Sequence, residues 1–236
     1  MNINKPIPLE SDHDWWWYRA KRNFLKLLIT RNLQNNDLDT KKILEIGPGL
    51  GNNLNLLNNF GKVDILEVEN QFIDFNNLYN KQYFENCFVD FTEIKTKYDL
   101  IIFLDVLEHI DDTKNFLKNV KKILEKNGLI ILSTPAYMSL WSDHDIALKH
   151  FRRYNIKLLS SQLSPHFKIK NFYGMNYLLL PIRYIQIKLF KNPNSVKEGE
   201  ILNKLLYYIS LLEFVMLKLK LNFKFGISLF TVCVNE

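Results

Sequence analysis

The chain has 236 residues, of which 47% are hydrophobic and 14% aromatic. This length and apolar content favour one α/β domain with an embellishment, and they exclude a disordered chain or two full-sized domains. The net charge of +6 is unevenly spread, because residues 151–236 carry 13 basic and 4 acidic residues and residues 1–150 carry 18 and 21. A basic C-terminal part suits an anionic substrate, a phospholipid surface or nucleic acid, or simply a solvated lysine-rich face.

The chain begins Met-Asn-Ile-Asn-Lys-Pro-Ile-Pro, which lacks the apolar core of a signal peptide, so a cytoplasmic protein is expected. Cys87 and Cys233 lie in apolar runs and are expected to be buried thiols in a reducing compartment, not a disulfide. The spacing of Cys and His residues does not indicate a metal site, so none is predicted.

Strands and helices are expected to alternate along the chain through residue 173. The predicted strands are 41–46, 62–67, 86–90, 98–104, 128–134 and 166–173, and the predicted helices are 14–31, 50–59, 70–79, 112–126 and 155–163. Such alternation is typical of a parallel sheet joined by right-handed crossovers. A seventh strand is expected at 227–234.

Residues 43–53 read Ile-Leu-Glu-Ile-Gly-Pro-Gly-Leu-Gly-Asn-Asn, so a strand carrying Glu45 leads into Gly47, Gly49 and Gly51. Glycine permits a sharp turn and close approach of a ligand, and the next helix offers free N–H groups to a carboxylate or phosphate. Asn52 stands where the dinucleotide fingerprint G-x-G-x-x-G has its third glycine, which disfavours a nicotinamide oxidoreductase. An acid two residues before the first glycine fits an ammonium group better than a pyrophosphate.

Three later strands also end in polar residues. Glu67 ends the second strand, at the distance from the glycine loop where an acid binds ribose hydroxyls in nucleotide-binding sheets. Asp90 and Phe91 end the third strand, and the fourth runs into Asp-Val-Leu-Glu-His, which contains Asp105 and His109. Because open α/β sheets bind ligands at the C-terminal edge of their strands, these residues are expected to gather at one site.

This combination resembles motif I of the class I S-adenosylmethionine-dependent methyltransferases, and Asp-Val-Leu-Glu-His is similar to motif IV of their ubiquinone-biosynthesis-like, small-molecule branch. The resemblance implies a Rossmann-like seven-stranded sheet, parallel except for the last strand. It implies that Glu45, Gly47, Gly49 and Gly51 hold the amino-acid end of S-adenosyl-L-methionine, Glu67 the ribose, and Asp90 and Phe91 the adenine. Asp105 would lie near the methionine moiety or the reaction centre, and S-adenosyl-L-homocysteine would be the product.

The loop after strand five contains Pro-Ala, Leu-Trp-Ser, Asp and His-x-Arg-Arg-Tyr in that order. This pattern is similar to a bacterial subgroup of class I methyltransferases, some associated with surface polysaccharide or lipid biosynthesis. The resemblance covers nearly the whole chain, but Trp15 stands where the subgroup usually has His before its paired aromatic residues. One ring of the Trp-Trp-Trp-Tyr run at residues 15–18 is expected in the core, and another over the cofactor, where a sulfonium could meet an aromatic face.

The same loop supplies the candidate substrate and catalytic side chains. The candidate substrate contacts are Trp141, Arg152, Arg153 and Tyr154. An arginine could clamp a carboxylate or phosphate, or it could pair with an acid such as Asp143 or Asp145. The candidate general bases are His109, His144 and His150, because histidine titrates near neutrality and can take a proton from a hydroxyl.

Residues 174–224, between strands six and seven, contain two apolar helical stretches at 177–190 and 201–221. Charged residues and Pro181 interrupt them, so neither is expected to span a membrane. They are expected to form a helical cap over the substrate pocket, or a cap that also touches a membrane surface. The single domain would then comprise an N-terminal helical cover (1–40), a cofactor-binding core (41–173), the cap (174–224) and the final strand (225–236).

The sequence therefore predicts a methyltransferase that acts, at oxygen, on a small acidic or amphiphilic acceptor, including lipid- or sugar-linked ones. It would work in the cytoplasm or at the inner face of the membrane, and its oligomeric state is not predicted. An RNA methyltransferase is disfavoured because Asp105-Val-Leu-Glu stands where an Asn/Asp-Pro-Pro-Tyr motif would follow strand four. A non-catalytic interaction module on the same fold is disfavoured by the intact glycine motif.

Overall fold

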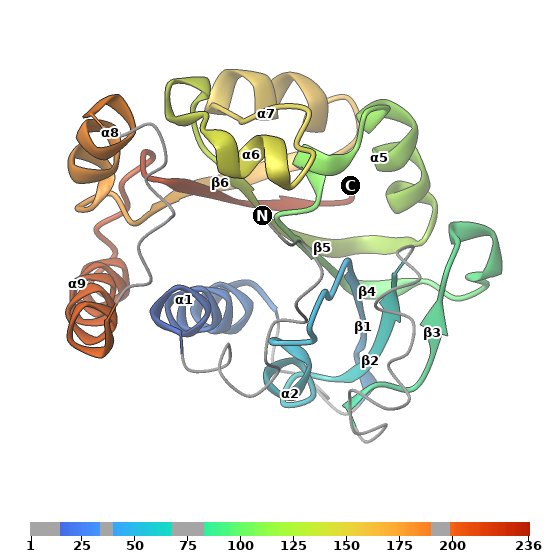
Figure 1. Ribbon diagram of the computed structural model, residues 1–236. Helices are drawn as coiled ribbons and strands as arrows, with labels where there is room; N and C mark the ends of the chain where they lie inside the picture. Colours follow the sequence, from blue (N-terminus) through green and yellow to red (C-terminus); the bar gives the residue numbers. More distant parts are fainter. Residues whose placement is uncertain (1–14, 34–39, 68–82, 190–198) are drawn as a thin grey trace.

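The computed structural model describes residues 15–33, 40–67, 83–189 and 199–236 and contains one seven-stranded sheet in the order β3-β2-β1-β4-β5-β7-β6 (Figure 1). The strands are β1 (Lys42–Ile46), β2 (Lys62–Leu66), β3 (Cys87–Phe88), β4 (Tyr98–Leu104), β5 (Leu124–Pro135), β6 (Lys168–Met175) and β7 (Ser228–Val234). Strand β7 runs antiparallel to β5 and β6, and the other neighbouring pairs are parallel. The predicted sheet with an antiparallel last strand is confirmed.

Helices cover both faces of the sheet, so the fold has three layers (Figure 1). One face packs against α1 (Trp16–Asn32) and α2 (Leu54–Leu57), and the other against α5 (Thr113–Lys122) and α7 (Ile156–Leu163). In β4, Leu100 and Ile102 face the first core while Ile101 and Phe103 face the second. A strand buried on both faces must be apolar at successive positions, which is the pattern that predicted it.

Side-chain hydrogen bonds fix where helices α5 and α7 begin. Asp112 accepts a hydrogen bond from the N–H of Asn115 at 3.0 Å and starts α5, and Asn155 accepts one from Leu158 at 2.8 Å and starts α7. These N-caps satisfy main-chain donors that a first helical turn leaves open. Both helices begin one residue after the predicted position.

Several predicted elements differ in length from the observed ones. The helix predicted at 50–59 is only α2, since this segment contains five asparagines, which favour turns over helix. The helix predicted at 112–126 ends at Lys122 because β5 already begins at Leu124. The short helix α6 (Asp143–Ala147) was not predicted, and the helix predicted at 70–79 lies outside the described residues.

The prediction that both cysteines are buried is wrong for Cys87. Its side chain is exposed because β3 is the edge strand of the sheet and has only two residues. Cys233, by contrast, lies on β7, which is paired on both sides with β5 and β6, and is fully buried, as predicted. Both thiols are free.

Two helices, α8 (Leu180–Leu189) and α9 (Glu200–Lys218), lie between β6 and β7 in the chain. Helix α9 runs beside α1 in the same direction, because the N–H of Trp16 binds Asn203 Oδ1 at 2.8 Å and Arg31 Nη2 donates to the carbonyl of Leu217 at 2.7 Å. None of the described helices is both long and apolar enough to cross a bilayer.

Candidate functional site

The glycine loop after β1 has the backbone that its sequence predicts. Gly47, Gly49 and Gly51 have φ values of +64°, +54° and +68°, which side chains disfavour. A Cβ on Gly47 would lie 2.7 Å from Val106 Cγ2, whereas a Cβ on Gly49 would meet no atom within 4 Å. Gly47 therefore lets the loop pack against the end of β4, and Gly49 leaves open space beside the main chain.

Glu45, at the end of β1, is 2% exposed. Its Oε1 accepts a hydrogen bond from Asn53 Nδ2 at 2.8 Å, and its Oε2 is buried without a hydrogen-bond partner. Burial raises the pKa of Glu45 to about 7, against the opposing effect of the Asn53 hydrogen bond. A buried acceptor without a donor costs free energy, so this oxygen is suited to receive the ammonium group of a ligand.

The residues predicted after β2 and β3 lie at the same edge of the sheet. Glu67 is buried, and its N–H donates to the carbonyl of Phe88 at 2.9 Å. Asp90 is exposed and accepts a 2.7 Å hydrogen bond from the N–H of Thr92, which lowers the pKa of Asp90 and starts the 3₁₀ turn Phe91–Glu93. Phe91 is half-buried and packs edge to face on Phe116, with ring centroids 5.7 Å apart.

Asp105 follows β4 with a φ of +53°, which is uncommon for a residue other than glycine. Its Oδ1 accepts a hydrogen bond from Ser133 Oγ at 2.8 Å, and its Oδ2 forms an ion pair with Lys21 of α1. Burial lowers the pKa of Lys21, while the negative charge of Glu108 opposes that shift. The Lys21 ammonium also lies 5.0 Å from the centre of the Trp17 ring.

The aromatic run at the start of α1 behaves as predicted in one respect. Trp16 is buried, and its ring packs edge to face on that of Trp17 at 5.4 Å. Lys21 was not predicted as part of the site, although it interrupts the apolar face formed by Ala20, Phe24 and Leu25. A lysine among buried helix positions is a signal that it has an acidic partner elsewhere in the fold.

A second group of side chains follows Asp105 on the 3₁₀ turn Leu107–His109. Glu108 is fully buried, burial raises its pKa, and neither carboxyl oxygen has a hydrogen-bond partner. The rings of His109 and His150 meet edge to face at 4.6 Å. One potential ligand atom each from Glu108, His109 and His150 lies within 4.8 Å of the others, so these three residues could hold a metal ion. Residue spacing did not predict this group, because His150 is distant in sequence.

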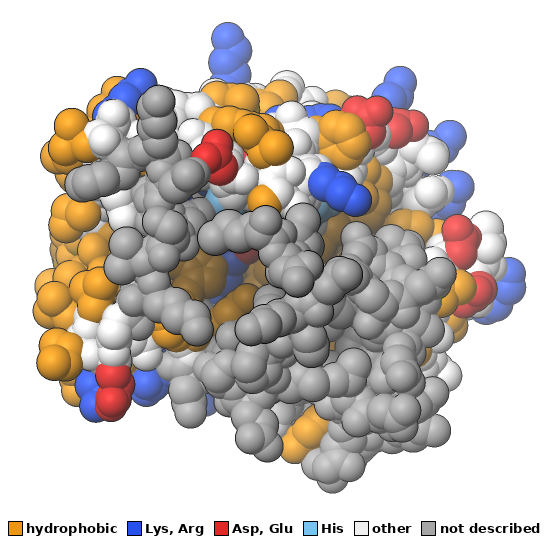
Figure 2. All heavy atoms as spheres, in the orientation of Figure 1, with side chains coloured by type: hydrophobic (Ala, Val, Ile, Leu, Met, Phe, Trp, Pro, Cys, Tyr) orange, Lys and Arg blue, Asp and Glu red, His pale blue; other side chains and the backbone are white. Residues whose placement is uncertain are grey.

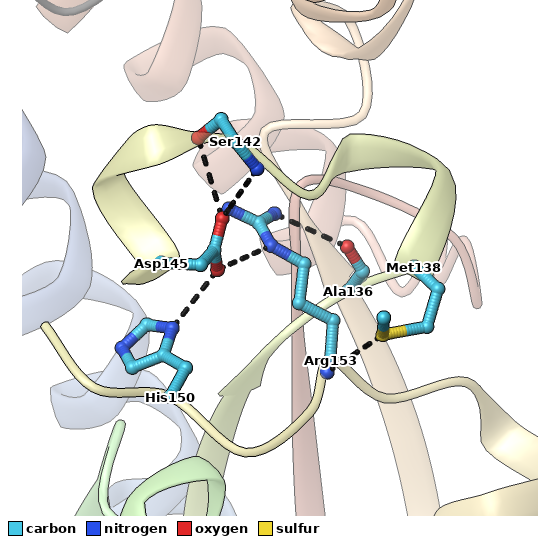
Figure 3. Close-up of polar contacts among 6 residues, drawn as sticks. All are labelled: Ala136, Met138, Ser142, Asp145, His150 and Arg153. Atoms are coloured by element: carbon cyan, nitrogen blue, oxygen red, sulfur yellow. Dashed lines mark hydrogen bonds and ion pairs between the residues drawn. The ribbon is translucent and has the colours of Figure 1, made fainter. Parts of the chain in front are cut away.

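Asp145 connects His150 to Arg153 (Figure 3). His150 Nδ1 lies 2.9 Å from Asp145 Oδ1, and Arg153 donates from Nε to Oδ1 at 2.7 Å and from Nη2 to Oδ2 at 2.9 Å. Burial alone would raise the pKa of Asp145, but the hydrogen bonds from His150 and Arg153 and the Arg153 charge hold it well below its usual range. The ionised carboxylate makes His150 Nδ1 the donor and leaves Nε2 as an acceptor.

The remaining predicted residues have different surroundings. Arg153 is buried against Asp145, and Tyr154 is fully buried and donates to the carbonyl of Leu107 at 3.1 Å, so both face the protein interior. Arg152 is half-buried and reaches Asp111 Oδ1 at 3.4 Å. Trp141 is half-buried after the 3₁₀ turn Met138–Leu140, and His144 is exposed on α6, outside the group formed by Glu108, His109 and His150.

A cleft of about 520 Å³ opens beside the glycine loop, between α1 and the α2 segment. Arg22 and Lys26 line it from α1, Gly51 and Asn52 line it from the loop, and Tyr83 closes one side. The cleft therefore adjoins the glycine loop and does not include the histidines at the other end of the site.

A family model described as "Methyltransferase domain" matches residues 16–173, which include the glycine loop, Asp105 and the Asp145–His150 pair. The chain belongs to this methyltransferase family. S-adenosyl-L-methionine is therefore its methyl donor. No curated protein matches the sequence significantly.

Solved structures of methyltransferases share the fold at low sequence identity. The putative methyltransferase in a complex with the Haloferax volcanii Trm112 methyltransferase activator has a TM-score of 0.61 and 13% identity, covering 96% of this chain and 92% of its own. The N-methyltransferase NodS from Bradyrhizobium japonicum WM9, with S-adenosyl-l-homocysteine, has a TM-score of 0.57 and 12% identity, covering 96% and 94%. Geranyl diphosphate C-methyltransferase from Streptomyces coelicolor A3(2) has a TM-score of 0.57 and 9% identity, covering 90% and 76%.

Proposed function

We propose that this methyltransferase transfers a methyl group to an oxygen atom of a small acidic or amphiphilic acceptor, which can be lipid- or sugar-linked. The observation that carries the proposal is the His150 ring, which Asp145 holds by Nδ1 beside His109 at the C-terminal edge of the sheet. This arrangement leaves an imidazole nitrogen able to take a proton near the strand ends that would hold the cofactor. Helices α8 and α9 would cap the substrate side.

The cofactor assignments rest on the geometry of the strand ends. Glu45 would bind the ammonium group of S-adenosyl-L-methionine through its unpaired Oε2, and the open space at Gly49 would admit the amino-acid end. Glu67 would bind the ribose, and Asp90 with Phe91 would bind the adenine. Asp105 would lie beside the methionine moiety, where Lys21 and Ser133 fix its carboxylate.

The bound cofactor supplies a methyl group on a sulfonium, which is already electrophilic. The chain must then align the acceptor oxygen, exclude water and remove the hydroxyl proton. His150 Nε2 would accept that proton, and the ionised Asp145 would stabilise the imidazolium through Nδ1–H. His109, in contact with the His150 ring, is the second candidate for this role.

Arg152 is the residue best placed to recognise an acidic group on the acceptor. Its side chain is partly exposed, and its partner Asp111 is 81% exposed. Such surface ion pairs contribute little to stability, so an anionic acceptor could replace Asp111 at small cost. A carboxylate acceptor would use this contact and would need no base.

Calorimetric titration with S-adenosyl-L-homocysteine tests the cofactor site. The wild type should bind and Gly49→Arg should not. Gly199→Arg is the control, because a Cβ at either glycine would meet no atom within 4 Å, and this variant should bind like the wild type. Transfer of labelled methyl groups should then be screened on sugar acids, amphiphilic lipids and RNA. Transfer to RNA alone would contradict the proposal, and absence of cofactor binding by the folded wild type would indicate a non-catalytic interaction module.

A further inference from the structure

Helix α9 exposes an apolar stripe along its whole length. The stripe consists of Ile201, Leu205, Tyr208, Leu212, Val215 and Leu219, which are 44% to 86% exposed. Their spacing of four and three residues places them on one face of a helix. The opposite face carries the buried Ser210, Glu213 and Leu217, so the stripe points away from α1 and the sheet.

Helix α8 and its flanks extend this apolar surface. Leu178, Ile182, Ile185 and Leu189 repeat the same spacing and are also exposed. Fourteen of the nineteen exposed large hydrophobic side chains of the described chain lie between Leu178 and Phe225. Figure 2 shows hydrophobic side chains gathered along the left margin of the molecule, where Figure 1 places α8 and α9. We call this surface the α8–α9 face. Exposed apolar side chains are concentrated there, whereas on an ordinary protein surface they are scattered singly.

The charges around the α8–α9 face are almost all positive. Lys188, Lys204, Lys218, Lys220 and Lys224 are exposed there. Of the two acids in the described part of this segment, Glu200 is exposed beside Lys204 and Glu213 is buried. Lys188 lies over the ring of Tyr184 and Lys218 over that of Phe214, at 5.7 Å and 5.2 Å, so their stems cover apolar surface while their ammonium groups stay at its border.

We propose that the α8–α9 face docks on the surface of an anionic lipid bilayer. An apolar stripe bordered by lysines matches the boundary between acyl chains and anionic headgroups, where a helix lies in the plane of the membrane. A second copy of this chain fits less well, because pairing two such faces would bring lysine-rich borders together without acidic partners. Since the described helices do not span a bilayer, the contact is peripheral.

Docking in this way would bring the candidate substrate loop to the lipid surface. Helix α8 packs against the 3₁₀ turn Met138–Leu140, which directly precedes Trp141. A lipid-linked acceptor could then reach the site without leaving the bilayer. This consequence rests on the proposed function, whereas the docking itself does not.

Flotation of the full chain with vesicles tests the docking. The protein should float with vesicles of phosphatidylcholine and phosphatidylglycerol, bind weakly to phosphatidylcholine alone, and dissociate at high salt. The variant Leu205→Gln/Leu212→Gln should lower the partition coefficient at least about tenfold, because it removes two apolar anchors. The control Val89→Gln changes an exposed apolar residue beside β3, at the edge of the sheet opposite β6, and should leave binding unchanged.

A charge variant and a measurement of mass complete the test. Lys218→Glu/Lys220→Glu should abolish the preference for anionic vesicles. Sedimentation velocity should show the same molecular mass for the wild type and Leu205→Gln/Leu212→Gln. A wild-type dimer that this variant dissociates would make the face an interface between copies and overturn the proposal, as would failure of the folded wild type to bind either vesicle. Binding of S-adenosyl-L-homocysteine is measured separately, so failure of the docking proposal can be told apart from failure of the proposed function.

Discussion

Asp145 determines the state of the histidine side of the site. Its two oxygens receive hydrogen bonds from His150, Arg153 and the N–H of Ser142, and none of its side chain is exposed (Figure 3). A buried carboxylate with this many donors stays ionised, and it fixes both the orientation and the tautomer of the imidazole. Replacing Asp145 itself would leave Arg153 buried without its partner, so function is better tested at His150.

The proposed base gives the first prediction. With a hydroxyl acceptor, His150→Gln should lower kcat/KM by about 10²–10⁴-fold, the usual contribution of general base catalysis. His144→Gln, on the exposed side of α6, should retain nearly full activity. Steady-state assays with labelled S-adenosyl-L-methionine measure both variants. Equal, small decreases in kcat/KM in the two variants would show that His150 is not the general base.

Glu45 gives the second prediction, which concerns pH. Its pKa of about 7 means that the free protein holds this group protonated in mild acid. If Glu45 binds the ammonium of the ligand as proposed, the bound state favours the ionised carboxylate, and binding should release a proton. The affinity for S-adenosyl-L-homocysteine should therefore rise with pH, by at most about tenfold per unit, and level off above about pH 7.

Calorimetry between mild acid and neutrality, in two buffers of different ionisation enthalpy, measures both the affinity and the proton released. Glu45→Gln should bind weakly at every pH and release no proton. Wild-type affinity that does not change across this range would contradict contact between Glu45 and the ammonium group.

Residue chemistry was predictable where it follows from local sequence. Glu45 and its glycines are neighbours in the chain, so their spacing alone indicated a ligand loop, and its backbone has the expected positive φ values. Lys21 and Asp145 were not predicted as parts of the site, because each acquires its role from a partner in another element. The pairing of Arg153 with an acid was one of two alternatives, and the structure selects Asp145.

At the scale of elements, α9 is fixed to the end of β6 by a buried acid. Glu213 accepts hydrogen bonds from the N–H groups of Asn176 at 2.6 Å and Leu178 at 2.8 Å, while Ser210 Oγ donates to Asn176 Oδ1 at 2.9 Å. Asn176 has a φ of +58°, so these contacts hold the chain in a disfavoured conformation as it leaves the sheet. The face of α9 opposite the apolar stripe is thus anchored by polar groups.

Burial raises the pKa of Glu213 to about 7, although three main-chain hydrogen bonds oppose the shift. The folded chain therefore keeps this proton in a range where the unfolded chain has lost it, and the contribution of Glu213 to stability falls as pH rises from about 4.5 to about 7. Glu213→Gln removes this titration. At low pH the variant should be less stable by about 1 kcal/mol, because it loses one good acceptor.

Urea unfolding at several pH values measures this third prediction. The difference in the free energy of unfolding between the wild type and Glu213→Gln should disappear or reverse above pH 7, where the wild type must bury a charged carboxylate. Glu200→Gln is the control, because this acid on the same helix is exposed and pairs with Lys204 at the surface. If the free energies of unfolding of the wild type and Glu213→Gln changed in parallel with pH, a raised pKa for Glu213 would be contradicted.

Element boundaries were less predictable than element types. Apolar runs located all seven strands, but β5 begins at Leu124, within the segment predicted as the end of a helix. The residues of that turn pair with Tyr98 and Asn235, and such contacts leave no local sequence pattern. Likewise, the capping box of α6, formed by Ser142 and Asp145, was not recognised among the polar residues of the loop.

At the scale of the whole molecule, the sheet brings together groups that are far apart in sequence. The order β3-β2-β1-β4-β5-β7-β6 places the ends of β1 and β4 side by side, with β2 and β5 flanking them. Lys21 ties α1 to this edge through Asp105, and α9 in turn packs along α1. Cofactor binding at the edge should therefore stabilise the cooperative fold and not merely one loop.

This coupling gives the fourth prediction. At about one hundred times its dissociation constant, S-adenosyl-L-homocysteine should add about 2.7 kcal/mol to the free energy of unfolding. For a domain of this size that corresponds to a rise in Tm of about 5–10 °C, measured by calorimetry or circular dichroism. Gly49→Arg should show no rise, whereas Leu205→Gln/Leu212→Gln, changed only on the α8–α9 face, should show the full rise. If Leu205→Gln/Leu212→Gln lost the ligand-induced rise in Tm, the change on the apolar face would have abolished cofactor binding, because a ligand stabilises only the folded state that binds it. The apolar face and the cofactor site would then not be independent.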